Sequence, residues 1–129
     1  MSAQGPYAIA RKACHWVRRN PEAWERLVGL CEWFHHVRPA NRLRRGDLFN
    51  YAQQMGMSVT LCKEFRFDNN MWSALSRYVL MCRPHLSEVI HPRSCELDGI
   101  DMAEVWAVCV GAPLPFAVMD WREAEVVLA

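Results

Sequence analysis

The segment GDLFNYAQQMGMSVTLCKEFRF, residues 46–67, decides how the centre of the chain folds. Residues 48–55 carry apolar side chains at helical spacing, and Gly56 is the kind of residue that ends a helix. Beyond Gly56 the apolar residues fit one face of a helix, but they also fit the alternation of a β-strand. The segment therefore predicts either a second helix after a tight turn or a small β-hairpin near residues 57–67.

The first alternative resembles a helix-turn-helix, the motif in which a second helix enters the major groove of DNA. Ala52 is small enough for a close helix contact, Gly56 permits the turn, and Ser58 can cap the second helix. The core side of that helix would be apolar: Val59, Cys62 and Phe65. The outward side would meet phosphates and base edges: Thr60, Lys63, Glu64 and Arg66. The negative charge of Glu64 opposes an anionic ligand, so a surface turn between two core helices is the alternative.

Helical spacing of apolar residues recurs on both sides of the centre, over residues 7–19, 21–37 and 71–83 and in a helix that runs through Cys109. Candidate N-caps precede these stretches: Asn20, Asp47, Asn69 or Asn70, Asp98 and Asp101. With 52% apolar and 22% charged residues, the composition suits a folded core. We predict a mainly α fold, a single compact multi-helix domain over residues 1–129 with a helix-turn-helix-like centre. The end of the chain, DWREAEVVLA, is predicted as a last short helix or a docked tail.

The net charge is +1, but the charges are distributed unevenly. Residues 1–45 hold nine arginines and lysines against three glutamates, and residues 85–129 hold eight acidic residues against two arginines. Basic residues gather in two places: Arg11, Arg18 and Arg19 on one face of the first helix, and Arg42, Arg44 and Arg45 before the central segment. Such a chain either offers a basic face to a polyanion or pairs its two ends internally.

The cysteines and histidines give weaker signals. Six cysteines lie scattered in apolar segments, and we expect free buried thiols rather than disulfides. Zinc-type ligands occur at Cys82, His85, His91 and Cys95, but no Cys-x-x-Cys pair accompanies them, so a metal site is the less favoured alternative. The chain has no phosphate-binding loop, carboxylate pair or nucleophile elbow. We therefore expect no enzyme and no bound metal or cofactor.

The ends of the chain bear on its location and partners. The first residues, MSAQGPYAIARKACHW, lack the apolar core of a signal peptide, and the apolar run VWAVCVGAPLPFAVM is interrupted by prolines and too short to cross a bilayer. We expect a soluble protein of the bacterial cytoplasm. Trp33 and Trp121 are less clearly directed inward: they are candidates for a protein interface, and burial or partial burial in the core is the favoured alternative. A homodimer is a further expectation.

The segment FDNNMWSALSRYVLMCRPHLSEVIHPR, residues 67–93, resembles a stretch found in small, poorly characterised proteins of bacteriophages and prophages. The matching positions are Asn69, Asn70, Ser73, Arg77 and Tyr78. The resemblance extends to NPEAWERLVGLCEWFHH and spans residues 20–93. It implies a small phage accessory protein, and it carries over neither an activity nor a functional residue.

Two functional hypotheses follow. The first is DNA binding by a phage-type accessory protein through the helix-turn-helix-like segment and the basic N-terminal half. In that hypothesis Arg42, Arg44 and Arg45 hold phosphates, while Thr60, Lys63 and Arg66 approach the groove and Asn69 assists. The second is a non-catalytic inhibitor that binds a host protein, as anti-defence proteins do, through the acidic last third of the chain or an exposed tryptophan.

Overall fold

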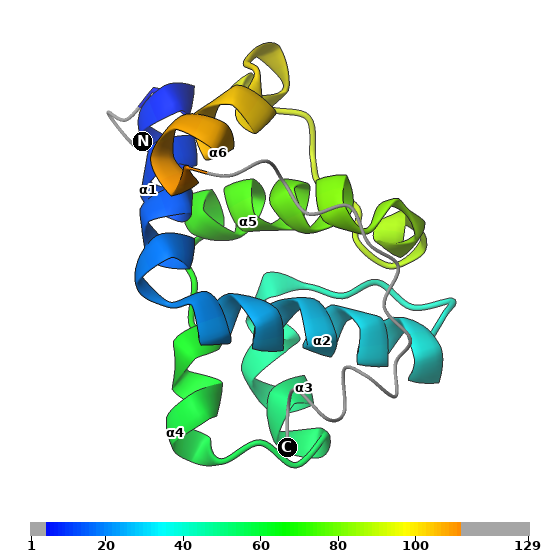
Figure 1. Cartoon of the computed structure of the whole chain (residues 1–129). Helices are drawn as coiled ribbons and strands as arrows, with labels where there is room; N and C mark the ends of the chain where they lie inside the picture. The colour runs from blue at the N-terminus through cyan, green and yellow to red at the C-terminus, as the bar shows by residue number, and fades with distance from the viewer. Residues whose placement is uncertain (1–4, 112–129) are drawn as a thin grey trace.

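The structure, a computed structural model, describes residues 5–111 of the chain (Figure 1). Within this range the secondary structure is helical and contains no strand, so the mainly α prediction is confirmed. The α-helices are α1 (Pro6–Arg19), α2 (Pro21–Val37), α3 (Leu48–Gln54), α4 (Val59–Cys62), α5 (Asn69–Cys82) and α6 (Met102–Val110). The 3₁₀ helices are η1 (Arg45–Asp47), η2 (Lys63–Phe65), η3 (Pro84–Glu88) and η4 (Glu96–Gly99). None of the helices in residues 5–111 has the length and apolar content that crossing a bilayer requires.

Helix α2 lies between two groups of helices (Figure 1). Helices α1, α5 and α6 pack together on one side of it, and α3 and α4 lie on the other. Helix α1 buries one face in this arrangement, with Ala10, Ala13, Cys14 and Val17 in the core. The opposite face, which carries Arg11, Arg18 and Arg19, is exposed. The predicted basic stripe of the first helix is therefore on the surface.

Several helix boundaries follow the local signals of the sequence. Helix α2 begins at Pro21, directly after Asn20, because proline is favoured in the first helical turn. Gly56 follows α3 with φ 98°, and Gly111 ends α6 with φ 79°, a backbone region that glycine enters without steric cost. Asp101 caps α6, since its Oδ1 accepts a hydrogen bond from the Glu104 N–H at 3.1 Å.

Other predicted caps are wrong. Helix α5 begins two residues earlier than expected, and its cap is Asp68, whose Oδ1 accepts from the Met71 N–H at 2.7 Å. Asn69 is thereby the first residue of α5 rather than its cap. Neither Asn20 nor Asp47 caps a helix through its side chain. Trp121 and the predicted element at residues 120–129 lie outside the described residues.

Residues 57–67 contain no strand, and the β-hairpin prediction is wrong. Ser58 caps α4, because its Oγ accepts from the Leu61 N–H at 3.3 Å. Cys62 and Phe65 are buried as predicted, but Val59 is 52% exposed. The element after the turn is four residues of α-helix followed by three of 3₁₀ helix. Val59 is the first residue of α4, directly after the turn, and it is the one residue of the predicted apolar face that lies outside the core.

Tyr78 of α5 ties together the helices on its side of α2. Its hydroxyl donates a hydrogen bond to the Met102 carbonyl oxygen at 3.0 Å and accepts one from the Cys14 Sγ at 3.3 Å. Its ring centre lies 5.0 Å from that of Trp106. Burial raises the pKa of the Tyr78 hydroxyl, and it raises the pKa of the Cys14 thiol to about 11, so both groups are protonated at neutral pH. These contacts fix α5, which forms a wall of the site described next.

Candidate nucleic-acid interface

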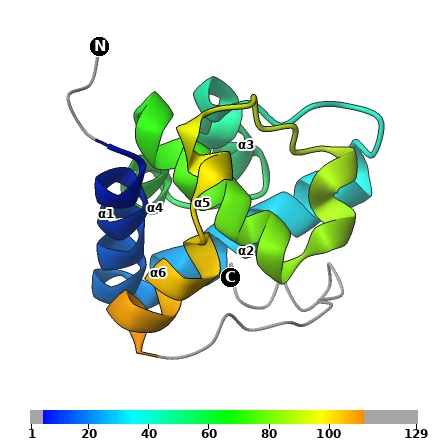
Figure 2. The ribbon, with the colours of Figure 1, turned by 90° about the horizontal axis from the view of Figure 1, so that it is seen from above.

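Two connections run along the same edge of the molecule (Figure 2): residues 38–44, which follow α2, and residues 90–95, which lie between η3 and η4. The N–H of the buried Leu43 donates to the carbonyl oxygen of Val89 at 2.8 Å. Arg42 Nη2 donates to the carbonyl oxygen of His91 at 3.0 Å. These bonds bring arginines that are about fifty positions apart in the chain to one edge.

A pocket of about 540 Å³ is formed by these two connections and the first half of α5. We call it the arginine pocket, and its polar and aromatic lining includes Arg42, Arg44, Arg45, Asn69, Trp72 and Arg93. No carboxylate is among the described residues that line it. Four guanidinium groups around one hollow favour an anionic ligand, because guanidinium forks match the oxygens of phosphate and carboxylate.

The four arginines keep their positive charge available. Arg42 is bonded to the His91 carbonyl, and Arg45 Nη1 donates to the Phe67 carbonyl oxygen at 2.9 Å. Neither bond neutralises a guanidinium group, since a carbonyl has no net charge. Arg44 and Arg93 make no side-chain hydrogen bond or ion pair with another residue of the described range. Within residues 5–111, then, the arginine pocket is not neutralised by the protein's own acids.

Trp72 is the aromatic part of the arginine pocket. Its side chain is half-buried, and it lies one helical turn beyond Asn69 on the same face of α5. The other tryptophans in residues 5–111 each lie against another aromatic ring, whereas Trp72 has no ring partner there. An indole face beside guanidinium groups suits a planar base that is joined to a phosphate.

A second basic hollow, of about 570 Å³, lies along α1. We call it the α1 pocket, and it is lined by Arg11, Lys12, His15, Trp16, Arg19 and Met71 among others. Its described lining contains no carboxylate either. Phe67 contacts one lining residue of each pocket, because its ring meets Trp16 edge-on at 5.1 Å between centres while its carbonyl accepts from Arg45. Met71 lines the α1 pocket while Asn69 and Trp72 line the arginine pocket, so the two pockets are neighbours at the start of α5.

The side chains predicted to read the DNA groove lie outside both pockets. Thr60 and Lys63 are exposed on α4 and η2, and Arg66 is exposed with its guanidinium carbon 4.6 Å from the ring centre of Phe49. Glu64 shares their segment. The structure thus gathers four of the predicted site residues into one pocket, Arg42, Arg44, Arg45 and Asn69, and places Thr60, Lys63 and Arg66 elsewhere.

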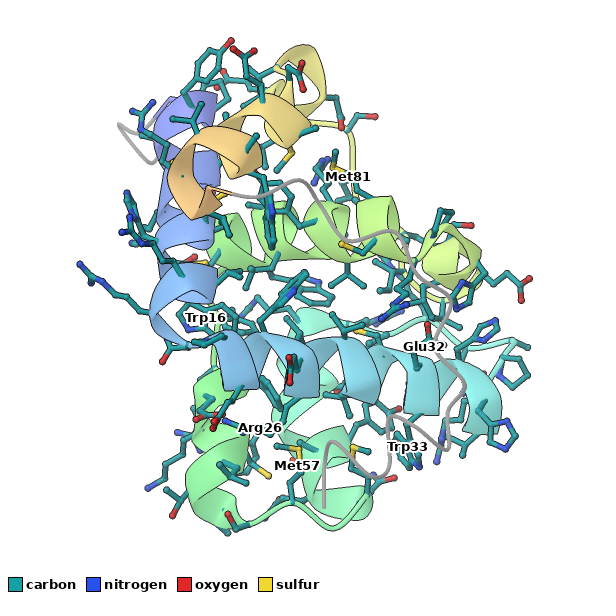
Figure 3. All side chains as sticks on the ribbon, viewed as in Figure 1. Trp16, Arg26, Glu32, Trp33, Met57 and Met81 are labelled. Carbon is teal, nitrogen blue, oxygen red and sulfur yellow. The ribbon has the colours of Figure 1, made fainter. Side chains whose placement is uncertain are left out.

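Two arginines outside the pockets, Arg26 and Arg77, are bound to carboxylates. Figure 3 shows Arg26 on the side of α2 that faces α4 and η2, and its Nη2 lies 2.6 Å from Oε2 of Glu64 in η2. Arg77 of α5 is 8% exposed and donates from Nε to Asp98 Oδ1 at 3.0 Å. Its Nη2 also donates to the carbonyl oxygen of Arg93 at 2.7 Å. Arg77 therefore anchors the connection that carries Arg93 to the arginine pocket, and its hydrogen bond holds the pKa of Asp98 below the ordinary value.

A buried carboxylate joins α2 to the segment after α5. Glu32, labelled in Figure 3, is 4% exposed, and its Oε1 lies 2.7 Å from His85 Nε2 and 4.0 Å from Arg83 Nε. Nearby, His35 Nε2 lies 3.0 Å from Glu88 Oε2. These contacts connect α2 with η3, which is a structural role in the fold.

The four zinc-type ligands do not come together. Cys82 is buried in α5, and burial raises the pKa of its thiol to about 11. His85 is paired with Glu32, whereas His91 and Cys95 are exposed on the connection to η4. Across the part of the chain that the structure describes, no three histidine, cysteine or acidic side chains are grouped as a metal ion would require.

Sequence reasoning missed Arg93 and Trp72 as members of the site. Arg93 is an isolated arginine in an acidic third of the chain, and Trp72 falls on an apolar helix stripe. Arg93 joins the pocket through the contact between Leu43 and Val89, and Trp72 joins it because α5 forms one wall; no local pattern predicts either arrangement. The uneven charge distribution marked Arg42, Arg44 and Arg45, but it gave no signal for Arg93 or Trp72, which lie outside the basic part of the chain.

Comparison of this chain with protein-family models, with curated proteins and with solved structures gives no match. The resemblance of residues 20–93 to phage and prophage proteins therefore stays a prediction, and the interpretation of the site depends on its geometry and charge.

Proposed function

We propose that this protein binds nucleic acid and that the arginine pocket is its main contact. The proposal is carried by one observation: Arg42, Arg44, Arg45 and Arg93 surround a hollow whose described lining contains no carboxylate. Arginine-to-phosphate contacts are the usual source of affinity for a polynucleotide, and they require guanidinium groups that are not already paired with acids.

The α1 pocket supports the choice of a polyanion over a small anion. A polynucleotide repeats its charge along its length, so it gains affinity from successive basic sites. Arg11, Lys12 and Arg19 line the α1 pocket, which neighbours the arginine pocket at the start of α5. Because the net charge of the chain is only +1, local clustering of this kind is what favours association.

The proposal is tested by fluorescence anisotropy with labelled oligonucleotides over a range of salt concentrations. Removal of two pocket charges, as Arg44→Gln with Arg93→Gln, should weaken binding at low salt roughly tenfold and should make the logarithmic salt dependence shallower by about two phosphate contacts. The matched control is Arg38→Gln with Arg66→Gln, which removes the same charge outside both pockets. Equal losses in the two double variants would indicate attraction by net charge alone and would contradict a pocket site.

The second hypothesis, a non-catalytic inhibitor of a host protein, is favoured by a different observation. Val108 of α6 is 77% exposed and Tyr7 of α1 is 52% exposed, on two helices that pack together. Exposed apolar and aromatic side chains are typical anchors of protein interfaces. Under this hypothesis a Val108→Lys substitution removes partner binding in pull-down from host lysate, whereas the Arg44 and Arg93 substitutions leave it unchanged.

A further inference from the structure

We propose that the arginine pocket seats one nucleotide of a single-stranded DNA or RNA, with the base stacked on Trp72 and the phosphate held by the arginines. This inference rests on the proposed function and specifies the ligand class of the same site. It differs from the sequence-based prediction, in which a helix reads the major groove of a duplex.

The shape of the site favours a single strand. A volume of about 540 Å³ lies in the range of pockets that enclose a small ligand, so it suits one or two nucleotides. A duplex keeps its bases stacked and paired inside, where an indole in the wall of a pocket does not reach them. A single strand has free base faces, and stacking on tryptophan is the usual way in which proteins hold them.

Trp72 has the surroundings that this role requires. It is half-buried, so the protein fixes its position, and no aromatic ring of residues 5–111 lies against it. Arg44 and Arg93 line the same hollow without a partner among those residues. One nucleotide can therefore stack its base on Trp72 and place its phosphate beside Arg44 and Arg93. Neither contact requires a hydrogen bond or ion pair within residues 5–111 to break.

The segment predicted for duplex binding is less suited to that task. Its second element has one turn of α-helix, whereas a recognition helix presents residues over several turns. Although Arg26 forms an ion pair with Glu64, the carboxylate still places a negative charge on this element, and that charge opposes an anionic ligand. Arg66 lies over the Phe49 ring. Few side chains of the segment are left to enter a groove.

The α1 pocket is the second binding position that we propose for the single strand. Met71 lines the α1 pocket and its neighbours Asn69 and Trp72 line the arginine pocket, so a strand that passes the first turn of α5 would extend from one pocket to the other. The α1 pocket also contains a half-buried tryptophan, Trp16. Two neighbouring basic hollows with an indole in each match the alternation of phosphates and bases along a single strand.

The experiment measures binding of the full chain to fluorescein-labelled dT12, U12 and a 12-base-pair duplex at the same salt concentration. We expect at least one of the single strands to bind roughly tenfold more tightly than the duplex. Trp72→Leu should weaken single-strand binding by roughly tenfold, and Trp72→Phe, which keeps an aromatic face, by less. The control is Trp33→Leu, because Trp33 is also half-buried but lies outside both pockets, against Tyr51.

A second measurement on the unmodified protein guards against misfolding of the Trp72 variant. Ultraviolet crosslinking of a 5-bromouridine oligonucleotide, followed by peptide mass spectrometry, should label Trp72. Tighter binding of the duplex would overturn this inference and leave the proposed function standing. Crosslinks that avoid Trp72, or a folded Trp72→Leu variant with unchanged affinity, would also overturn it. No binding of any of the three probes at low salt would overturn both proposals.

Discussion

Arg77 and Arg93 lie on adjoining parts of the molecule and are held in opposite ways. Arg77 is buried and donates hydrogen bonds to a carboxylate and to two carbonyl groups, those of Ser73 and Arg93. Arg93 is exposed, lines the arginine pocket and has no side-chain partner among residues 5–111. The backbone of Arg93 is thus fixed by Arg77, while its side chain is left for solvent or a ligand.

The difference separates two uses of the same residue type. A guanidinium group that is buried must be hydrogen-bonded, and loss of its bonds destabilises the fold. A guanidinium group that lines an open hollow contributes little to stability but retains its attraction for an outside anion. Substitution of a buried arginine should therefore change the free energy of unfolding, whereas substitution of a pocket arginine should change the affinity for an anionic ligand.

The largest effect is expected from Arg77→Met, which retains an apolar stem but removes every hydrogen bond of the guanidinium group. The variant leaves the Arg93 carbonyl without its donor, and we expect the free energy of unfolding to fall by about 2–4 kcal/mol. Urea denaturation followed by circular dichroism measures this. A loss below about 0.5 kcal/mol would show that Arg77 does not anchor the connection after η3.

An intermediate effect is expected from acid. Because the pKa of Asp98 is lowered in the folded state, its pairing with Arg77 stabilises the fold at pH values above the ordinary pKa of aspartate, about 4. That contribution is lost as the pH falls through the lowered pKa of the folded state. Asp98→Asn removes the titration, so the difference in unfolding midpoint between the wild type and this variant should shrink below about pH 4. A difference that stays constant over the acid range would contradict the pairing.

The smallest effect on stability is expected in the arginine pocket. Arg44→Gln with Arg93→Gln removes no side-chain bond of the described residues, so the free energy of unfolding should change by about 0.5 kcal/mol or less. The same denaturation experiment measures it, beside the affinity measurement of the same variant. Strong destabilisation by this double substitution would show that Arg44 and Arg93 stabilise the fold, as Arg77 does. It would contradict the distinction between buried arginines and pocket arginines.

The helices were predictable where local signals agree. Residues 21–37 match α2 because a proline start and a long apolar stripe select the same helix. Residues 57–67 were ambiguous because a seven-residue element is too short to separate a period of two from one of 3.6. Asp68 was missed as a cap because two asparagines directly after it are equally good candidates by residue type.

The site was predictable only in part. Arg42, Arg44 and Arg45 are consecutive or nearly so, and a local cluster of charge is visible in a sequence. Their meeting with Asn69, Trp72 and Arg93 depends on how α5 and the connection after η3 pack, which is set by contacts between residues far apart in the chain. A sequence pattern predicts the periodicity of a helix. It does not predict the direction of the chain after that helix, and so it does not predict which elements pack together.

Phe67 has a consequence for how the two hollows respond to one another. Its ring meets Trp16 and its carbonyl accepts from Arg45, so a shift of this one residue would move one lining residue of each hollow. A ligand bound in one of the two pockets would then change the affinity of the other pocket for that ligand. This would be an energetic coupling between two sites of a single chain. A double-mutant cycle with Trp16→Leu and Arg45→Gln would express that coupling as a departure from additivity, and longer strands would bind with a cooperativity that short ones lack.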